Sequence, residues 1–167
     1  MKTEVVIPLV RYRIDIDRNL EKLMSTIHDV LGRKGGKVLT VNVSVSVLDA
    51  IRTMADANIG AMVIKDDELL VGIFTERDYM RKIALKGLSS ATTIVADVMS
   101  SPLITVNIGE SIHVAMDTMT RCRCRHLVVM DKESMAGIIS LGDMVKHMLQ
   151  DKEAEVEQLS SYIAGSY

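Results

Sequence analysis

The sequence predicts an α/β (α+β) fold in which two pseudo-symmetric β-α-β-β-α repeats pack as a pair. The first observation is that the chain matches itself at an offset of 65 residues. The second is that each copy alternates short β-rich runs with helical patterns. The third is that 48% of the residues are hydrophobic and 12 are Met, which suits an adaptable aliphatic core. An N-terminal extension and a long C-terminal helix complete the predicted architecture.

The repeat pairs residues 40–78 with residues 105–143 without a gap. Of these 39 paired positions 13 are identical, and Asp78 meets Asp143 at the end of the match. Self-similarity at a fixed period indicates an internal duplication. Because each copy alone would leave an apolar face in water, we expect the two copies to pack together and to form clefts between them.

The repeat divides the chain into four predicted segments. Residues 1–23 are the N-terminal extension, 24–90 the first repeat, 91–150 the second repeat and 151–167 the C-terminal helix and tail. The C-terminal pattern keeps apolar residues on one side of a helix with acidic residues between them. Such a stripe indicates either packing within the chain or burial against a second subunit.

Each copy is predicted to run strand, helix, strand, turn, strand, helix. Residues 38–42 and 103–107 are short β-rich runs. Ser46 and Ser111 precede apolar residues at helical spacing, so we expect them to be N-cap residues. Two apolar strands across an acidic turn follow in each copy and indicate a hairpin.

Composition narrows the class of protein. The net charge of −2 arises from mixed signs, so nucleic acid and anionic membranes are not expected partners. No apolar run reaches the length of a membrane span, and the first residues lack the features of a signal peptide. The two cysteines, at C-x-C spacing, cannot form an ordinary disulfide with each other. We therefore expect reduced thiols and a cytoplasmic protein.

The stretch TRCRCRHLVVMD contains both cysteines among three arginines. Through the offset, Cys122 and Cys124 match Ala57 and Ile59, so buried structural thiols are the expected state. A metal site is not expected, because tetrahedral zinc takes four ligands and only His126 is near. Redox chemistry stays an alternative, since neighbouring arginines can lower a thiol pKa.

Arg125 and His126 stand where the first copy has Gly60 and Ala61. The second copy therefore places charge where the first leaves bare backbone. Because a guanidinium binds phosphate through two hydrogen bonds, this position beside the cleft favours phosphate binding over simple solvation. The other two arginines of the stretch are expected to be solvated.

The segments GIFTERD and GIISLGD open the last helix of each copy. Thr75 or Ser140 offers a hydroxyl at the helix start, where free N–H groups attract anions. Asp78 or Asp143 follows three positions later. This spacing is a variant of the capping box. A carboxylate beside a hydroxyl also suits the vicinal hydroxyls of a ribose, so both interpretations stay open.

Taken together, these motifs resemble the tandem cystathionine β-synthase (CBS) domain pair, or Bateman module, in its small stand-alone bacterial-type form. The resemblance covers residues 27–162 and rests on NIGAMVI, GIFTERDYMRKI, RCRHLVVMD, GIISLGDMVKHML and EVEQLSSYIAG. It implies a non-catalytic regulatory module that binds AMP, ADP, ATP or NAD(H) as an energy or redox sensor. It also implies a disc-like homodimer and a regulated protein that the sequence does not identify.

The resemblance further implies two nucleotide clefts. One would combine Thr40, Ile59, Gly60 and Ala61 with Ser140 and Asp143, and with Arg125 and His126 at the phosphate. The other would combine Thr105, Cys124, Arg125 and His126 with Thr75, Arg77 and Asp78. Ile139 completes the predicted nucleotide-binding set. Because Gly142 stands where the first copy has Arg77, we expect the clefts to differ in phosphate preference and in occupancy.

Three other classes of function are alternatives to ligand sensing. An enzyme is not favoured, because no catalytic constellation recurs and no catalytic cofactor is implied. The histidines are scattered, and His113 and His147 are expected on the surface. A dimerisation scaffold with empty clefts remains the main alternative. Nucleic-acid binding through the arginines lacks support, since four Tyr and one Phe offer few stacking platforms.

Overall fold

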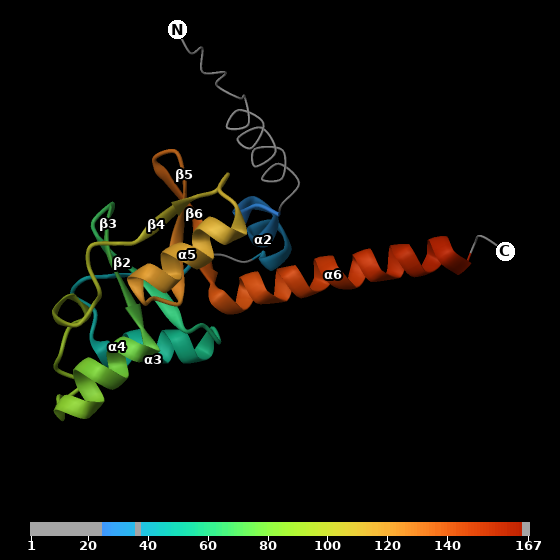
Figure 1. Ribbon diagram of the computed structural model, residues 1–167. Helices are drawn as coiled ribbons and strands as arrows, with labels where there is room; N and C mark the ends of the chain where they lie inside the picture. The colour runs from blue at the N-terminus through green and yellow to red at the C-terminus, as the bar shows by residue number, and fades with distance from the viewer. Residues whose placement is uncertain (1–24, 36–37, 165–167) are drawn as a thin grey trace, which may run out of the picture.

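The computed structural model describes residues 25–35 and 38–164 and contains two three-stranded sheets (Figure 1). The first sheet has the order β1 (Thr40–Asn42), β2 (Ala61–Asp66), β3 (Leu69–Thr75), and the second has the order β4 (Thr105–Asn107), β5 (His126–Asp131), β6 (Ser134–Ser140). In each, the first two strands are parallel and the last two antiparallel. The predicted fold class is confirmed, while the predicted extension, residues 1–23, lies outside the described residues.

Helices follow the strands in the predicted order. The helices of the first half are α2 (Ile27–Lys34), α3 (Val47–Asp56), α4 (Glu76–Asp78), a π turn η1 (Tyr79–Ile83) and two 3₁₀ turns, η2 (Ala84–Lys86) and η3 (Val95–Asp97). Those of the second half are α5 (Ile112–Cys122) and α6 (Leu141–Ala164). The predicted N-caps are confirmed, because the hydroxyls of Ser46 and Ser111 accept hydrogen bonds from Asp49 N and Val114 N.

The two hairpins keep one register. Ala61 pairs with Thr75 in the first hairpin, and His126 pairs with Ser140 in the second. Each ladder also shifts at one equivalent point, after Ile64 in one and Val129 in the other. The duplication is therefore retained in the hydrogen bonding. In both repeats this register places the start of the central strand beside the start of the following helix.

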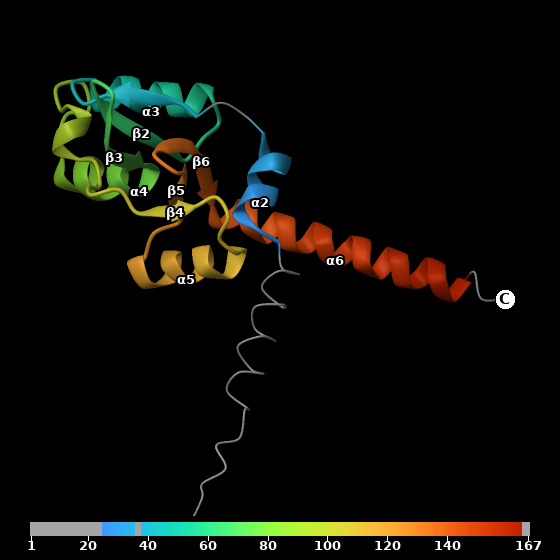
Figure 2. The ribbon, with the colours of Figure 1, turned by 90° about the horizontal axis from the view of Figure 1, so that it is seen from above.

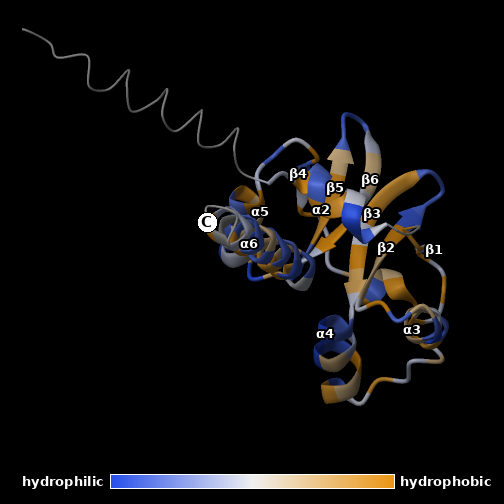
Figure 3. Cartoon of the chain, turned by 90° about the vertical axis from the view of Figure 1, so that its right-hand side faces the viewer, coloured by the Kyte–Doolittle hydropathy of each residue, from blue (hydrophilic) through white to orange (hydrophobic). Residues whose placement is uncertain are grey.

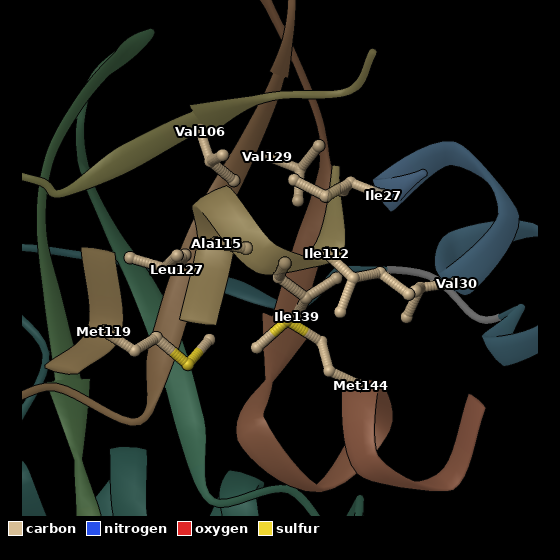
Figure 4. Close-up of a cluster of buried hydrophobic side chains, with 10 residues drawn as sticks. All are labelled: Ile27, Val30, Val106, Ile112, Ala115, Met119, Leu127, Val129, Ile139 and Met144. Carbon is tan, nitrogen blue, oxygen red and sulfur yellow. The ribbon is translucent and has the colours of Figure 1, made fainter. Parts of the chain in front are cut away.

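Each sheet has its own core, and each core takes side chains from outside its repeat. The first core contains Val47, Ala50, Met54, Met62, Ile64, Phe74, Ile83, Val95 and Val98. The second core contains Ile27, Val30, Val106, Ile112, Ala115, Met119, Leu127, Val129, Ile139 and Met144 (Figure 4). Val95 and Val98 thus cover the first sheet, and α2 covers the second. Each core therefore contains residues from both sides of the predicted boundary between residues 90 and 91. The exact domain boundaries stay a prediction.

Gly72 and Gly137 allow these crossing segments to approach the sheets. A Cβ on Gly72 would lie 2.5 Å from Met99 Sδ, and one on Gly137 would lie 2.7 Å from Leu31 Cδ2. Both distances are too short for a carbon atom beside these groups. The equivalent glycines therefore leave room for one apolar side chain each from the segment that precedes the other repeat.

Helix α6 extends away from the two sheets (Figures 1 and 2). Hydrophobic residues on it lie among hydrophilic ones (Figure 3). Val156 and Ile163 are 62% and 65% exposed, so packing within the chain does not explain this part of the stripe. Burial of these two against a second subunit stays a prediction. Among the described residues, no helix is long and apolar enough to cross a membrane.

Replacing Ile27 by Ala tests the contribution of α2 to the second core. Ile27 is fully buried, so the variant should lower the free energy of unfolding by about 2–5 kcal/mol. Urea denaturation followed by circular dichroism measures the change. Val156→Ala is the matched control, because an exposed position should change stability by less than about 0.5 kcal/mol. Equal effects of the two substitutions would contradict the packing of α2 described above.

Candidate ligand clefts

Two clefts lie where the repeats face each other. The first, here the α2 cleft, has a volume of about 570 Å³. Its lining comes from α2 and both repeats and includes Leu31, Lys34, Gly35, Ile59, Gly60, Ala61, His126, Gly137, Ile138, Ser140 and Asp143. The second, here the arginine cleft, has about 540 Å³. Its lining includes Gly60, Thr75, Arg77, Asp78, Arg81, Lys82, Ser100, Arg123, Cys124, Arg125 and His126.

The structure brings together most residues that the resemblance assigned to the two clefts. Three of the assigned residues line neither cleft, and Arg125 lines only one of the two to which it was assigned. Arg125 lines the arginine cleft and is not among the lining residues of the α2 cleft. Thr40 and Thr105 begin β1 and β4, in register with the central strands, and line neither cleft. Ile139 is fully buried in the second core.

The predicted helix-start motif forms the same network in both repeats. The Thr75 N–H and hydroxyl donate to Asp78 Oδ2 at 3.0 and 2.6 Å, and Asp78 N donates back to the hydroxyl at 3.2 Å. Ser140 makes the corresponding bonds to Asp143 Oδ2 at 2.7 and 2.8 Å, with 3.1 Å for the return. The capping-box interpretation is therefore confirmed in both repeats. It uses Oδ2 and leaves Oδ1 for other partners.

The second carboxylate oxygen distinguishes the two clefts. Asp78 Oδ1 accepts a hydrogen bond from the Ser100 hydroxyl and pairs with Lys82 Nζ, each at 2.8 Å. Asp143 Oδ1 accepts no hydrogen bond from any described residue. Lys34 Nζ instead reaches Asp143 Oδ2, at 2.7 Å. Asp143 lines the α2 cleft. Its Oδ1, without a partner among the described residues, can accept a donor of a ligand there, which Asp78 Oδ1 cannot do without losing a partner.

The two lysines are functional candidates that the motifs did not reveal. Lys82 follows Asp78 by four residues, so helical spacing alone could have placed them together. Lys34 lies 109 residues from Asp143, at the end of α2. Its Nζ also donates to Ile138 O at 2.9 Å. Only the packing of α2 on the second repeat brings it to the cleft, and no local sequence signal indicates that.

Charge differs sharply between the clefts. Five cations and one carboxylate line the arginine cleft: Arg77, Arg81, Lys82, Arg123, Arg125 and Asp78, with a formal sum of 5 − 1 = +4. Among the described residues that line the α2 cleft, the charged ones are Lys34 and Asp143, whose formal charges cancel. His126 lines both clefts. Burial, with Lys34 and Arg125 nearby, lowers the pKa of His126, so its imidazole is neutral at pH 7.

The carboxyl of Asp143 is ionised at neutral pH. Burial acts to raise its pKa, but hydrogen bonds from Lys34 and Ser140 outweigh burial, and the pKa lies below its ordinary value. A cleft carboxylate that stays charged is a strong acceptor for hydroxyl donors. The described lining of the α2 cleft therefore combines a net formal charge of zero with one localised anionic acceptor.

Two sequence-based expectations about cysteine and one about histidine need correction. Cys122 is exposed rather than buried, because it ends α5 on the solvent side. Cys124 is half-buried rather than buried. Burial, followed by the nearby Cys122, raises the pKa of Cys124, so the arginines do not make it a thiolate. His147 is buried and only 3% exposed, because α2 covers it, whereas His113 is exposed as expected. Within the described chain, no group of three His, Cys, Asp or Glu side chains could hold a metal ion.

The lowered pKa values predict two pH windows of lost stability. The folded pKa of His126 lies below 6.5, so the unfolded chain binds more protons as the pH falls through 6.5, and stability drops there. Ionised Asp143 contributes stability that is lost only as the pH falls below 3.8, toward the lower pKa that this carboxyl has in the folded state. Denaturation at a series of pH values should show that His126→Gln flattens the first window and Asp143→Asn the second. Unchanged slopes in either variant would contradict the stated environments.

Comparison with known proteins places this architecture in a family. The family model for the CBS domain matches residues 17–85 and 95–150. The chain is 38% identical over 152 residues to the CBS domain-containing protein CBSX3, mitochondrial, of Arabidopsis thaliana, covering 86% of this chain and 74% of that protein. It is 28% identical over 131 residues to the CBS domain-containing protein YhcV of Bacillus subtilis, covering 78% and 91%.

A solved structure gives the same result for the fold. The CBS-domain containing protein ATU1752 from Agrobacterium tumefaciens superposes with a TM-score of 0.69 at 37% identity, covering 74% of this chain and 98% of that one. The two family matches fall on the two repeats. The chain therefore belongs to the CBS domain family, as a tandem CBS pair.

Proposed function

We propose that the chain is a non-catalytic regulatory module that binds an adenosine-containing ligand between its repeats. One observation carries the proposal: Asp143 is ionised, faces the α2 cleft and keeps Oδ1 without a hydrogen bond from any described residue. A carboxylate so placed can accept the vicinal hydroxyls of a ribose. Leu31 and Ile59 give the same cleft apolar surface for a base.

Gly60 supports a close approach of a ligand. A Cβ on Gly60 would lie 3.5 Å from Glu76 Oε2 and 3.7 Å from His126, which are ordinary contacts. Packing within the chain therefore does not require glycine here, in contrast to Gly72 and Gly137. Gly60 lines both clefts, so its bare backbone leaves space for a ligand in either one.

A protein of the same fold supports the ligand class. The CBS domain protein PAE2072 from Pyrobaculum aerophilum has been solved complexed with AMP, and it superposes with a TM-score of 0.63 at 24% identity. This fold can therefore hold AMP in that protein. For this chain, the ligand and the residues that hold it are our proposal, with AMP, ADP, ATP and NAD(H) as candidates and energy or redox sensing as the role.

The charge of each cleft suggests which of the candidate ligands it binds. The described lining of the α2 cleft has no net formal charge and suits adenosine with little added charge, whereas the formal charge of +4 in the arginine cleft suits di- and triphosphates. Electrostatic attraction grows with the number of ligand charges, so each phosphate group should favour the arginine cleft further. We propose unequal occupancy on this ground.

The scaffold with empty clefts is the competing function. Its support is the exposed apolar stripe of α6, which suits a second copy of the chain. A similar fold occurs in a CBS-CP12 protein from cyanobacteria described as hexameric, at 23% identity and a TM-score of 0.67. A homodimer, disc-like or otherwise, is compatible with either function and stays a prediction. The cytoplasmic location also stays a prediction, and the similar CBSX3 is named as mitochondrial.

Asp143→Ala separates sensing from scaffolding. The variant should weaken binding of the adenine nucleotide about tenfold or more, because charge-assisted hydrogen bonds contribute about 1.5–3 kcal/mol. Thermal shift with AMP, ADP, ATP, NAD⁺ and NADH, on protein stripped of bound nucleotide, measures it. Asp117→Ala is the control, since Asp117 is exposed and, among the described residues, its only ion pair is with Arg121. A parent chain that responds to none of these ligands would favour the scaffold.

Arg125→Ala tests the charge difference between the clefts. Loss of this cation should weaken binding of ATP roughly fivefold and leave adenosine nearly unchanged, since one partly solvated charge contact contributes about 1 kcal/mol. Arg121→Ala is the matched control four residues away, because Arg121 is exposed and lines neither cleft. Isothermal titration calorimetry at two salt concentrations measures both ligands. An equal loss for ATP and adenosine would refute a phosphate role for Arg125.

A further inference from the structure

Helices α2 and α6 pack side by side (Figure 2). A further cavity, here the His147 cavity, is lined by residues of both. It has a volume of about 330 Å³ and is lined by Arg33 and Lys34 of α2 and by Lys146 and His147 of α6. Lys34 and Asp143 also line the α2 cleft. Their ion pair therefore forms part of the wall between the two spaces. None of the residues predicted from the motifs, apart from Asp143, belongs to this cavity.

His147 is the unusual group in the cavity. Its side chain is 3% exposed, and neither ring nitrogen has a hydrogen-bond partner among the described residues. Nε2 lies 3.2 Å from Asp151 Oδ2 without the geometry of a hydrogen bond. Buried polar atoms in proteins nearly always have partners. An unpartnered imidazole in the wall of a cavity indicates that a ligand supplies the missing contact.

Cations surround this imidazole. Arg33 pairs with Asp151 at 2.7 Å, and Lys34 pairs with Asp143 at 2.7 Å. Both pairs are partly exposed, and such pairs add little to stability, so their cations can turn toward an entering anion. Lys146 has no ion pair with any described residue. Arg33, Lys34 and Lys146 face the carboxylates of Asp143 and Asp151, with a formal sum of 3 − 2 = +1.

We propose that the His147 cavity binds a phosphate group. A guanidinium, two ammonium groups and an imidazole N–H supply donors from several directions, which matches the tetrahedral oxygens of phosphate better than a planar carboxylate. Phosphate also competes with Asp143 for Lys34. Its binding therefore takes Lys34 away from Asp143 Oδ2, which keeps its hydrogen bonds from Ser140. The carboxylate on the wall of the α2 cleft then lacks its neutralising cation, a coupling that rests on the proposed function.

Titration with inorganic phosphate tests the site directly. Calorimetry on the full chain, with potassium chloride of equal ionic strength as reference, should show saturable binding. The imidazole C–H resonance of His147 should shift with the same affinity. Lys146→Ala should weaken phosphate binding roughly fivefold, the order expected for one exposed charge contact. Lys146 is exposed, so this variant should fold even if the buried substitution His147→Gln does not.

Lys86→Ala is the matched control, because Lys86 is an exposed lysine that lines neither cleft nor the His147 cavity. It should bind phosphate like the parent. Phosphate that acts no differently from chloride overturns the proposal. So does an equal loss of affinity in Lys86→Ala and Lys146→Ala, which would indicate diffuse attraction by surface charge.

Two sources can supply this phosphate, and competition distinguishes them. If AMP displaces inorganic phosphate while adenosine does not, the group belongs to a nucleotide that extends from the α2 cleft. If neither displaces it, the ligand is free phosphate. Both outcomes support the site. If no nucleotide binds anywhere while phosphate binding still depends on Lys146, the proposed function is wrong, but the phosphate site in the His147 cavity is supported.

Discussion

The burial of each sheet by a segment from outside its own repeat is the interaction on which the rest of this structure depends. Ile27 and Val30 complete the second core, and Val95 and Val98 complete the first. Because the apolar face of a three-stranded sheet must be covered, neither repeat is complete alone. This exchange fixes how the repeats face each other and thus where the clefts form. It also brings the end of α2 to Asp143.

The hairpin register turns this arrangement into two related sites. Ala61 opposite Thr75, and His126 opposite Ser140, put the start of a central strand next to a helix start. The helix-start hydroxyl and the following Asp then form one network in each repeat. Duplication thus explains why the clefts share a carboxylate and a hydroxyl. It does not explain their differences, which come from residues that the repeat does not preserve.

The two clefts differ in charge. Part of this difference comes from positions that the two copies do not share, and part comes from the packing of α2. Arginines of α4, η1 and the second copy line one cleft, whereas among the described residues only Lys34 and Asp143 are charged in the lining of the other. Lys34 also connects the α2 cleft to the His147 cavity. Lys34, at the end of α2, therefore lies between the α2 cleft and the His147 cavity, and the group with which it pairs changes the charge in both. The two ligands that we propose would in this way influence each other through Lys34, without any change in the sheets.

The sequence by itself determined the duplication, the order of strands and helices, the helix caps and the Thr75/Asp78 and Ser140/Asp143 pairs. These features depend on local spacing and on a period that the chain repeats, so they are visible without coordinates. Tertiary structure alone decided that Lys34 reaches Asp143, that His147 is buried and that Cys122 is exposed. These contacts join residues far apart in the chain, or depend on which side of a helix another element covers. Local sequence patterns reveal neither these contacts nor this burial, because both depend on which other part of the chain packs against the residue.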